Sequence, residues 1–131
     1  MYLTIEHNSG VPISAQIVAQ IKYRVISGQL QPGERIPSVR ALAKDLKLNP
    51  TTVARIYRQL EAEQIICTQP GKGTFIRQMR SSLTLTEKRR QLTGNVRELV
   101  VEAGRIDLDF EELRRLLEQE INRIQQKESQ A

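Results

Sequence analysis

The stretch that decides the fold is Asn49-Pro50-Thr51-Thr52-Val53-Ala54-Arg55-Ile56-Tyr57-Arg58-Gln59-Leu60-Glu61. Asn49 suits a helix N-cap. Pro50 suits the first helical position, because the N–H that proline lacks would have no acceptor within the helix. Apolar residues recur at helical spacing and predict one buried face, formed by Val53, Ile56, Tyr57 and Leu60. The stretch therefore predicts an amphipathic helix with a defined start.

The opposite face of this helix predicts contact with a polyanion. It carries Thr51, Arg55 and Arg58, with Gln59 at its edge, and it holds no carboxylate before Glu61. Such a helix can enter a DNA major groove with its N-terminal residues towards the base edges. A solvated surface helix shows the same pattern, so the neighbouring segments decide between the two interpretations.

The preceding segments predict a helix-turn-helix. A helix is expected from Pro12 to about Gly28, and a second, short helix is expected after Ser38 as N-cap. Lys47-Leu48 then forms a tight turn into the helix that begins after Asn49, and two short helices so joined are a helix-turn-helix. Before them, Leu3 and Ile5 alternate with polar residues, as in a short edge strand.

The segment that follows predicts a β-hairpin. Two strand-like runs, 65–68 and 74–77, flank Gln69-Pro70-Gly71-Lys72-Gly73. A hairpin after a helix-turn-helix forms a wing, whose lysine and backbone amides can approach a phosphate or the minor groove. The alternative is a plain turn that needs glycine only for its backbone angles.

The region after Arg80 predicts two more helices, which begin at capping boxes formed by Thr84 with Glu87 and by Asp109 with Glu112. Two amphipathic helices of this length cannot bury both apolar faces as a self-contained domain. A second copy of the chain, related by two-fold symmetry, would cover them; the alternative is that they pack back on the winged domain. The predicted dimerisation residues are Leu92, Val96, Leu99, Val100, Phe110, Leu113, Leu117, Ile121 and Ile124.

Composition supports a polyanion-binding module joined to a different one. The 131 residues carry a net charge of +5, and residues 1–80 hold 11 basic against 5 acidic side chains, whereas residues 81–131 hold 9 against 10. The chain has no apolar run long enough to span a bilayer and no signal-peptide pattern, and its one cysteine, Cys67, excludes an internal disulfide. These features favour the cytoplasm, no membrane partner, no metal or cofactor, and no catalysis.

Four motifs resemble the GntR family of bacterial transcriptional regulators: residues 12–17 (Pro-Ile-Ser-Ala-Gln-Ile), 28–40, 49–53 and 71–75 (Gly-Lys-Gly-Thr-Phe). The short two-helix tail resembles the YtrA subfamily, the smallest type. Larger subfamilies carry an effector-binding or aminotransferase-like domain, for which the 54 residues from 78 onwards are too few. The resemblance thus implies a winged helix-turn-helix regulator whose effector, if one exists, is unknown.

The resemblance and the helix pattern together give a set of predicted DNA-binding residues: Arg35, Ser38, Arg40, Asn49, Thr51, Thr52, Arg55, Arg58, Gly71, Lys72 and Gly73. Many family members have Ser or Thr followed by Arg where this chain has Asn49-Pro50. Proline removes an amide donor and a basic side chain there, so base recognition is expected to depend more on Arg55 and Arg40.

The sequence therefore predicts a mainly α protein with a small β-hairpin. Residues 1–78 are expected to form the winged helix-turn-helix DNA-binding domain, and residues 82–127 a two-helix dimerisation domain. The expected function is a homodimeric repressor on a palindromic double-stranded operator, with a transporter operon as the target that the resemblance implies. The alternative is a winged helix that binds another protein without recognising a DNA sequence.

Overall fold

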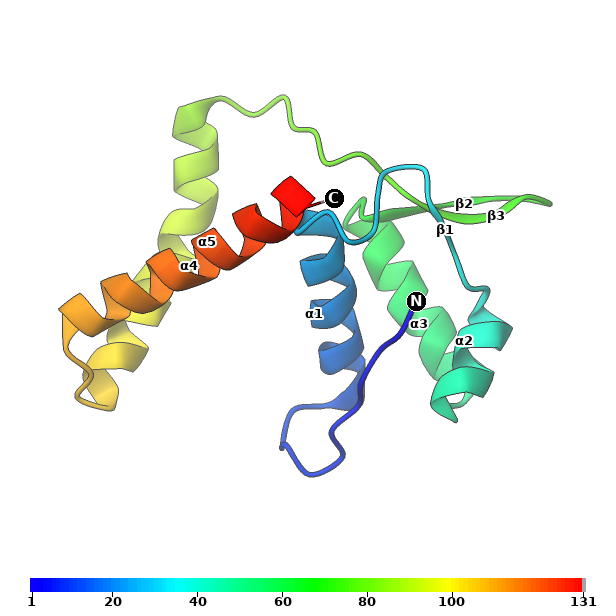
Figure 1. Cartoon of the computed structure of the whole chain (residues 1–131), viewed down its shortest axis with the longest axis horizontal. Helices are drawn as coiled ribbons and strands as arrows, with labels where there is room; N and C mark the ends of the chain where they lie inside the picture. The colour runs from blue at the N-terminus through cyan, green and yellow to red at the C-terminus, as the bar shows by residue number, and fades with distance from the viewer. Residues whose placement is uncertain (131) are drawn as a thin grey trace. The chain divides into compact units, whose positions relative to one another are not determined.

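The computed structural model describes residues 1–130, with side chains to residue 126. The chain forms two compact units, Met1–Met79 and Arg80–Ser129 (Figure 1). No helix in the described part of the chain is long and apolar enough to cross a membrane. Each unit is described by itself.

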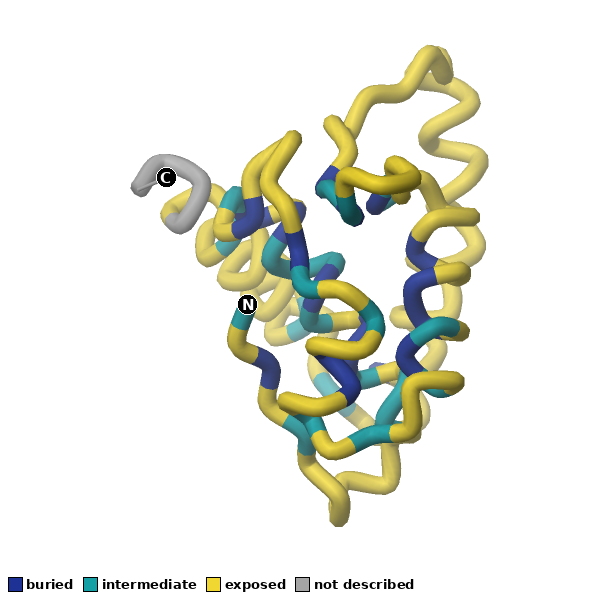
Figure 2. The backbone as a smooth tube through the Cα atoms, turned by 90° about the vertical axis from the view of Figure 1, so that its right-hand side faces the viewer, coloured by how far each residue is buried: buried dark blue, intermediate teal, exposed yellow. Residues whose placement is uncertain are grey.

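Three helices form the core of the first unit: α1 (Ile13–Ile26), α2 (Val39–Leu46) and α3 (Pro50–Ala62). Their apolar faces are buried where the helical spacing predicts, and Figure 2 shows this burial along the backbone. The largest fully buried apolar side chains are Ile17, Ile21, Leu42, Val53, Ile56, Leu60 and Ile66. The predicted helix-turn-helix is confirmed.

A three-stranded antiparallel sheet completes this unit, with β1 (Arg35–Ile36), β2 (Ile66–Gln69) and β3 (Gly73–Ile76) in the order β1-β3-β2. The predicted hairpin is present, with each strand shifted by one residue from the expected range. The strand β1 was not predicted, because two residues are too short for alternation to be detected. It pairs with β3 and thereby anchors the wing to the segment just before α2.

The predicted edge strand at Leu3 and Ile5 is wrong. This segment is extended and buries Leu3, but it pairs with side chains of α1 instead of a strand. The amide of Gln20 accepts from Thr4 N–H and donates to Thr4 C=O, at 3.0 and 2.5 Å. Gln16 does the same for Glu6, at 2.8 Å in both bonds. Two glutamine side chains thus satisfy backbone groups that a neighbouring strand would otherwise satisfy.

Polar contacts tie α3 to α1 and to the segment before α2. The Tyr57 hydroxyl donates to the Pro37 carbonyl at 2.6 Å, and burial raises the pKa of Tyr57 far above its ordinary value. Near the other end of α3, the Lys22 ammonium lies 2.7 Å from the Glu63 carboxylate. The hydrogen bond from Lys22 lowers the pKa of Glu63 below its ordinary value. Together these contacts fix α3 against both the α2 entry and α1.

The second unit consists of α4 (Leu85–Arg105) and α5 (Phe110–Gln130), which diverge from a short turn (Figure 1). Of the capping box predicted at the start of α4, the N-cap bond is present: Thr84 Oγ1 accepts from Glu87 N–H at 3.2 Å, while the Glu87 carboxylate accepts from the Thr84 hydroxyl at 3.2 Å instead of from the Thr84 backbone N–H. The capping box predicted for α5 is only half formed. Asp109 Oδ1 accepts from Glu111 N–H at 2.7 Å, whereas the carboxylate of Glu112 pairs with Arg115.

The apolar faces of α4 and α5 remain largely exposed in the single chain. Ala103 is buried near the turn, and Leu113 and Ile124 are half-buried. The other predicted dimerisation residues are exposed: Leu92, Val96, Leu99, Val100, Phe110, Leu117 and Ile121. The two helices therefore cover each other only in part.

Replacing Tyr57 with Phe should destabilise the first unit. The change leaves the Pro37 carbonyl without its donor in a part-buried position, which costs about 1–2 kcal/mol. Urea unfolding followed by circular dichroism measures this loss. Tyr2→Phe is the matched control, because Tyr2 is 80% exposed and should leave the midpoint unchanged. Equal midpoints for the Tyr57 variant and the native chain would contradict the role given to this hydroxyl.

Candidate nucleic-acid interface

At the start of α3, the backbone N–H groups are bonded to the N-cap residue, Asn49. Asn49 Oδ1 accepts from Thr51 N–H at 2.8 Å, and the Asn49 carbonyl accepts from Thr52 and Val53 N–H at 3.0 and 3.3 Å. Pro50 has no N–H to offer. The first turn of α3 therefore presents no free backbone donor to a ligand, and any contact it makes there must come from side chains.

The outer face of α3 carries the side chains that can make such contacts. Because Val53, Ile56 and Leu60 are buried, the helical repeat turns Thr51, Arg55 and Arg58 to solvent. These three residues are exposed at i, i+4 and i+7, so they form one stripe along the helix. Thr52 is half-buried at its edge, next to the cap.

The helix α2 provides a second group of donors at its start. Ser38 Oγ accepts from Ala41 N–H at 3.1 Å, which is the N-cap bond that the sequence predicts. Within residues 1–130, the N–H groups of Val39 and Arg40 have no acceptor. The exposed Arg40 guanidinium lies on the same first turn. Two free amides, a hydroxyl and a cation at a helix start can bind a phosphate; the free amides were not predicted.

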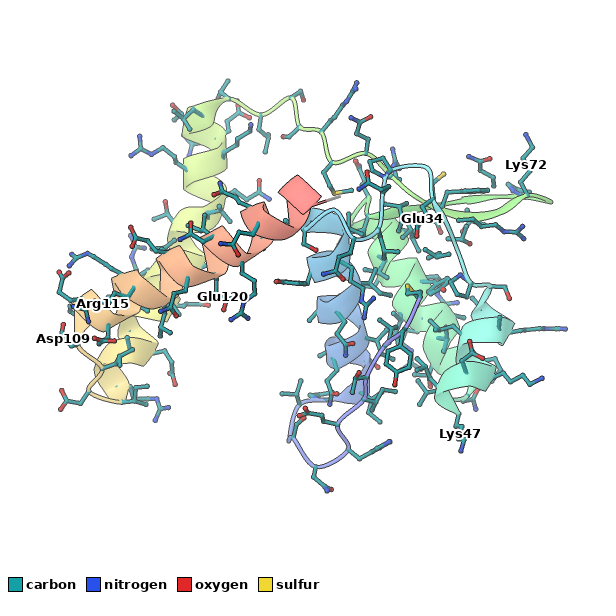
Figure 3. All side chains as sticks on the ribbon, viewed as in Figure 1. Glu34, Lys47, Lys72, Asp109, Arg115 and Glu120 are labelled. Atoms are coloured by element: carbon teal, nitrogen blue, oxygen red, sulfur yellow. The ribbon has the colours of Figure 1, made fainter. Side chains whose placement is uncertain are left out.

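The turn between α2 and α3 is fixed by backbone bonds. Lys47 adopts the left-handed conformation at φ 58°, and Leu48 N–H donates to the Ala43 carbonyl at 2.9 Å. This pattern is the usual C-terminal closure of a helix. Figure 3 shows Lys47 at this corner, with its side chain in solvent. The closure sets the angle at which α3 leaves α2.

The wing ends in a tight turn at Gln69-Pro70-Gly71-Lys72. Lys72 N–H donates to the Gln69 carbonyl at 2.9 Å, with Pro70 second and Gly71 third at φ 75°. These features are typical of a type II turn, which requires positive φ at its third residue. Lys72 extends from the tip into solvent (Figure 3). The predicted tip residue Gly73 instead begins β3 and pairs with Gln69.

The structure divides the predicted site residues into two groups. The first belongs to α2 and α3: Ser38, Arg40, Asn49, Thr51, Thr52, Arg55 and Arg58. The second belongs to the sheet: Arg35, Gly71, Lys72 and Gly73. Although Arg35 lies just before α2 in sequence, it is part of β1 and pairs with Phe75 of β3.

The cations of the two groups are not neutralised by nearby carboxylates. Among the described residues, none of Arg35, Arg40, Arg55, Arg58 and Lys72 forms an ion pair. Three of the five carboxylates of the first unit have other partners: Glu34 accepts from Gln31 N–H, Glu61 accepts from Thr68 N–H, and Glu63 pairs with Lys22. Unpaired cations on an exposed surface can bind a polyanion.

The second unit has a different charge arrangement. Four of its arginines pair with a glutamate three residues earlier in the same helix: Arg105, Arg114, Arg115 and Arg123. One of these exposed pairs lies at the end of α4 and three lie on α5, so the charge of these four arginines is compensated locally. Among the described residues, no cluster of His, Cys, Asp and Glu could hold a metal ion.

Residues 13–76 match the family described as bacterial regulatory proteins, gntR family. The HTH-type transcriptional repressor YtrA of Bacillus subtilis (strain 168) is 33% identical over 111 residues, which cover 85% of each chain. The crystal structure of a transcriptional antiterminator from Listeria monocytogenes EGD-e superposes with a TM-score of 0.82 at 34% identity, covering 95% of this chain and 92% of the other.

A third relative is YtrA from Sulfolobus acidocaldarius, a GntR-family transcription factor. It superposes with a TM-score of 0.56 at 27% identity, covering 89% of this chain and 97% of the other. These proteins are described as regulators of transcription rather than enzymes, and their likeness extends beyond the winged unit. The chain therefore belongs to the GntR family and is a transcriptional regulator with a winged helix-turn-helix DNA-binding domain.

Proposed function

We propose that the protein is a repressor that binds a palindromic DNA operator as a homodimer. The observation that carries this proposal is the outer face of α3, where two unpaired arginines and Thr51 are exposed beside a closed helix start. The family resemblance makes a transporter operon the expected target. A winged helix that binds another protein remains the alternative, although it would not need unpaired cations on both α3 and the wing.

Base recognition is assigned to side chains of α3. The Asn49 cap and Pro50 leave no backbone donor at the start of this helix, so a phosphate cannot be bound there through amides. Arg55 is exposed one turn after Thr51 and can place its guanidinium against a guanine edge. Arg58 follows on the same stripe, where it suits the backbone at the edge of the groove.

Positioning is assigned to α2 and the wing. The free N–H groups of Val39 and Arg40 at the start of α2 can donate to a phosphate, and Arg40 is exposed on the same turn. Lys72 lies on an exposed turn and has no carboxylate partner among the described residues. Contacts of this kind set the register of α3 on the duplex without carrying sequence information.

Dimerisation is assigned to the second unit. The apolar residues of α4 form an open groove lined by Leu85, Leu92, Val96 and Val100, with Lys88, Arg89 and Arg97 at its rim. The α5 seam contributes Phe110, Leu117 and Ile121, all of which are exposed in the single chain. A monomer would leave this apolar surface in water. Closed two-fold pairing covers it and presents two copies of α3 to one duplex.

DNA binding should be specific and salt-dependent. A mobility-shift assay on the DNA upstream of the protein's own gene should give a discrete complex, and footprinting should find two inverted half-sites about 10 base pairs apart. Affinity should fall steeply with salt, because several cations displace counterions from phosphates. A single asymmetric footprint would contradict the palindrome, and no complex with any duplex would favour the protein-binding alternative.

Arg55→Ala should weaken operator binding much more than binding to random duplex. A bidentate contact to guanine contributes roughly 1–3 kcal/mol of discrimination. Lys72→Ala is the matched comparison and should weaken both complexes to a similar extent, with a salt slope about one unit smaller. Titrations of both variants on operator and scrambled DNA at several salt concentrations measure this difference. Equal losses on both duplexes for the Arg55 variant, with the fold intact, would assign that arginine to positioning alone.

Leu117→Glu should convert the dimer into a monomer. Leu117 is 52% exposed in the single chain, so the substitution places a charge in the dimer seam at little cost to the monomer. Gln119→Glu is the matched control, because it adds the same charge to an exposed position on another face of α5. Light scattering on the full chain measures the mass. A Leu117 variant that keeps the native mass would contradict the assignment of the interface to α5.

A further inference from the structure

The wing places an arginine over a glycine. Because Ile36 is buried and strand side chains alternate, Arg35 lies on the outer face of the sheet. Its partner across the ladder is Phe75 of β3. Gly73 lies two residues before Phe75, at the diagonal position one row nearer the tip of the wing. A long side chain can reach that position.

The Arg35 guanidinium occupies the space that a side chain at position 73 would need. A methyl group built on Gly73 would lie 2.7 Å from Arg35 Nε, 3.3 Å from Cζ and 3.4 Å from Nη2. The first distance is too short for real carbon and nitrogen atoms. The end of an arginine side chain is flexible, so a methyl at this position would displace Arg35 rather than open the sheet.

Arg35 keeps its charge available in this position. The neighbouring Glu34 carboxylate accepts from Gln31 N–H at 3.3 Å, and Arg35 forms no ion pair within the described residues. Lys72, the residue before Gly73, is the cation at the tip of the wing (Figure 3). A guanidinium on β1 and an ammonium at the tip of the β2–β3 hairpin thus lie on one small sheet, and neither forms an ion pair within the described residues.

We propose that Gly73 is a positioning residue that seats Arg35 on the wing, and that the wing binds the DNA phosphate backbone with two cations, Arg35 and Lys72. The proposal rests on the proposed function, because it requires that the first unit binds DNA. It assigns Arg35 to the wing instead of to the start of α2. It also gives Gly73 a role beyond its backbone angle, which at φ 127° already favours glycine.

The test uses the full chain and a duplex of random sequence, since phosphate contacts need no operator. Arg35→Ala should weaken binding roughly five- to tenfold at 0.1 M salt and reduce the salt slope by about 0.9, as expected for one lost phosphate contact. Gly73→Ala should reproduce this loss. In the Arg35→Ala background, Gly73→Ala should have almost no further effect on affinity, because there is no guanidinium left to displace.

Gly33→Ala is the control for backbone strain. Gly33 has φ 84°, and a methyl built on it meets nothing within 4 Å, so the substitution strains the backbone without touching Arg35. Its affinity should stay within about twofold of native once the fold is verified by thermal unfolding. The same cycle can be measured by melting temperature alone, where Gly73→Ala should lower the melting temperature less in the Arg35→Ala background than in the native chain.

Three outcomes would overturn the proposal, and they differ from one another. If Gly73→Ala weakens binding and lowers the melting temperature equally in both backgrounds, the glycine acts through the wing backbone alone. If Arg35→Ala leaves the salt slope at its native value, Arg35 does not contact a phosphate. If the native chain binds no duplex at all, the assignment of DNA binding to the first unit fails, and the proposal fails with it.

Discussion

The burial of one face of α3 is the constraint on which the first unit depends. Val53, Ile56 and Leu60 are fully buried, and Tyr57 joins them with its hydroxyl on the Pro37 carbonyl. Because the helix has 3.6 residues per turn, burial of this face turns Thr51, Arg55 and Arg58 to solvent. The same helix therefore supplies the centre of the core and the surface that is proposed to recognise DNA. A substitution in the buried face would therefore change the orientation of the outer face, even though the substituted residue does not contact DNA.

The glutamate side chains of the two units have different partners. In the second unit, arginines at positions 105, 114, 115 and 123 each pair with a glutamate three residues earlier, so their charge is compensated locally. In the first unit, the carboxylates of Glu34 and Glu61 accept from backbone N–H groups, and none of Arg35, Arg40, Arg55 and Arg58 forms an ion pair among the described residues. Exposed pairs of the first kind add little stability. The excess positive charge of the chain lies in residues 1–80, which hold 11 basic against 5 acidic side chains, whereas residues 81–131 hold 9 against 10.

Much of the fold could be predicted from local chemistry in the sequence. The caps at Ser38, Asn49 and Thr84 and the apolar spacing of α3 depend on residues within one or two turns, and the structure confirms them. The errors arise where distant side chains decide. Leu3 alternates with polar neighbours as a strand would, but Gln20, 16 residues beyond Thr4, provides the partner instead of a strand. The strand β1 exists only because Arg35 and Ile36 meet β3, about 40 residues later, which no local pattern can indicate.

The sequence predicted which residues form the candidate site, but it could not predict which of them lie together. The chain order places Arg35 beside Arg40, whereas the sheet separates them and brings Arg35 over Gly73. The spacing of residues also could not indicate that α2 has free backbone N–H groups at its start and α3 has none. Asn49 and Ser38 are both good caps. In the first turn of α3, Pro50 has no N–H and Asn49 accepts from the N–H groups that follow, whereas at α2 the N–H groups of Val39 and Arg40 stay free. These contacts support the proposal that α2 and the wing bind phosphates and that α3 recognises bases. A dimer that covers the exposed seam of α4 and α5 would repeat this arrangement twice, so the spacing of the half-sites depends on how the second units pair.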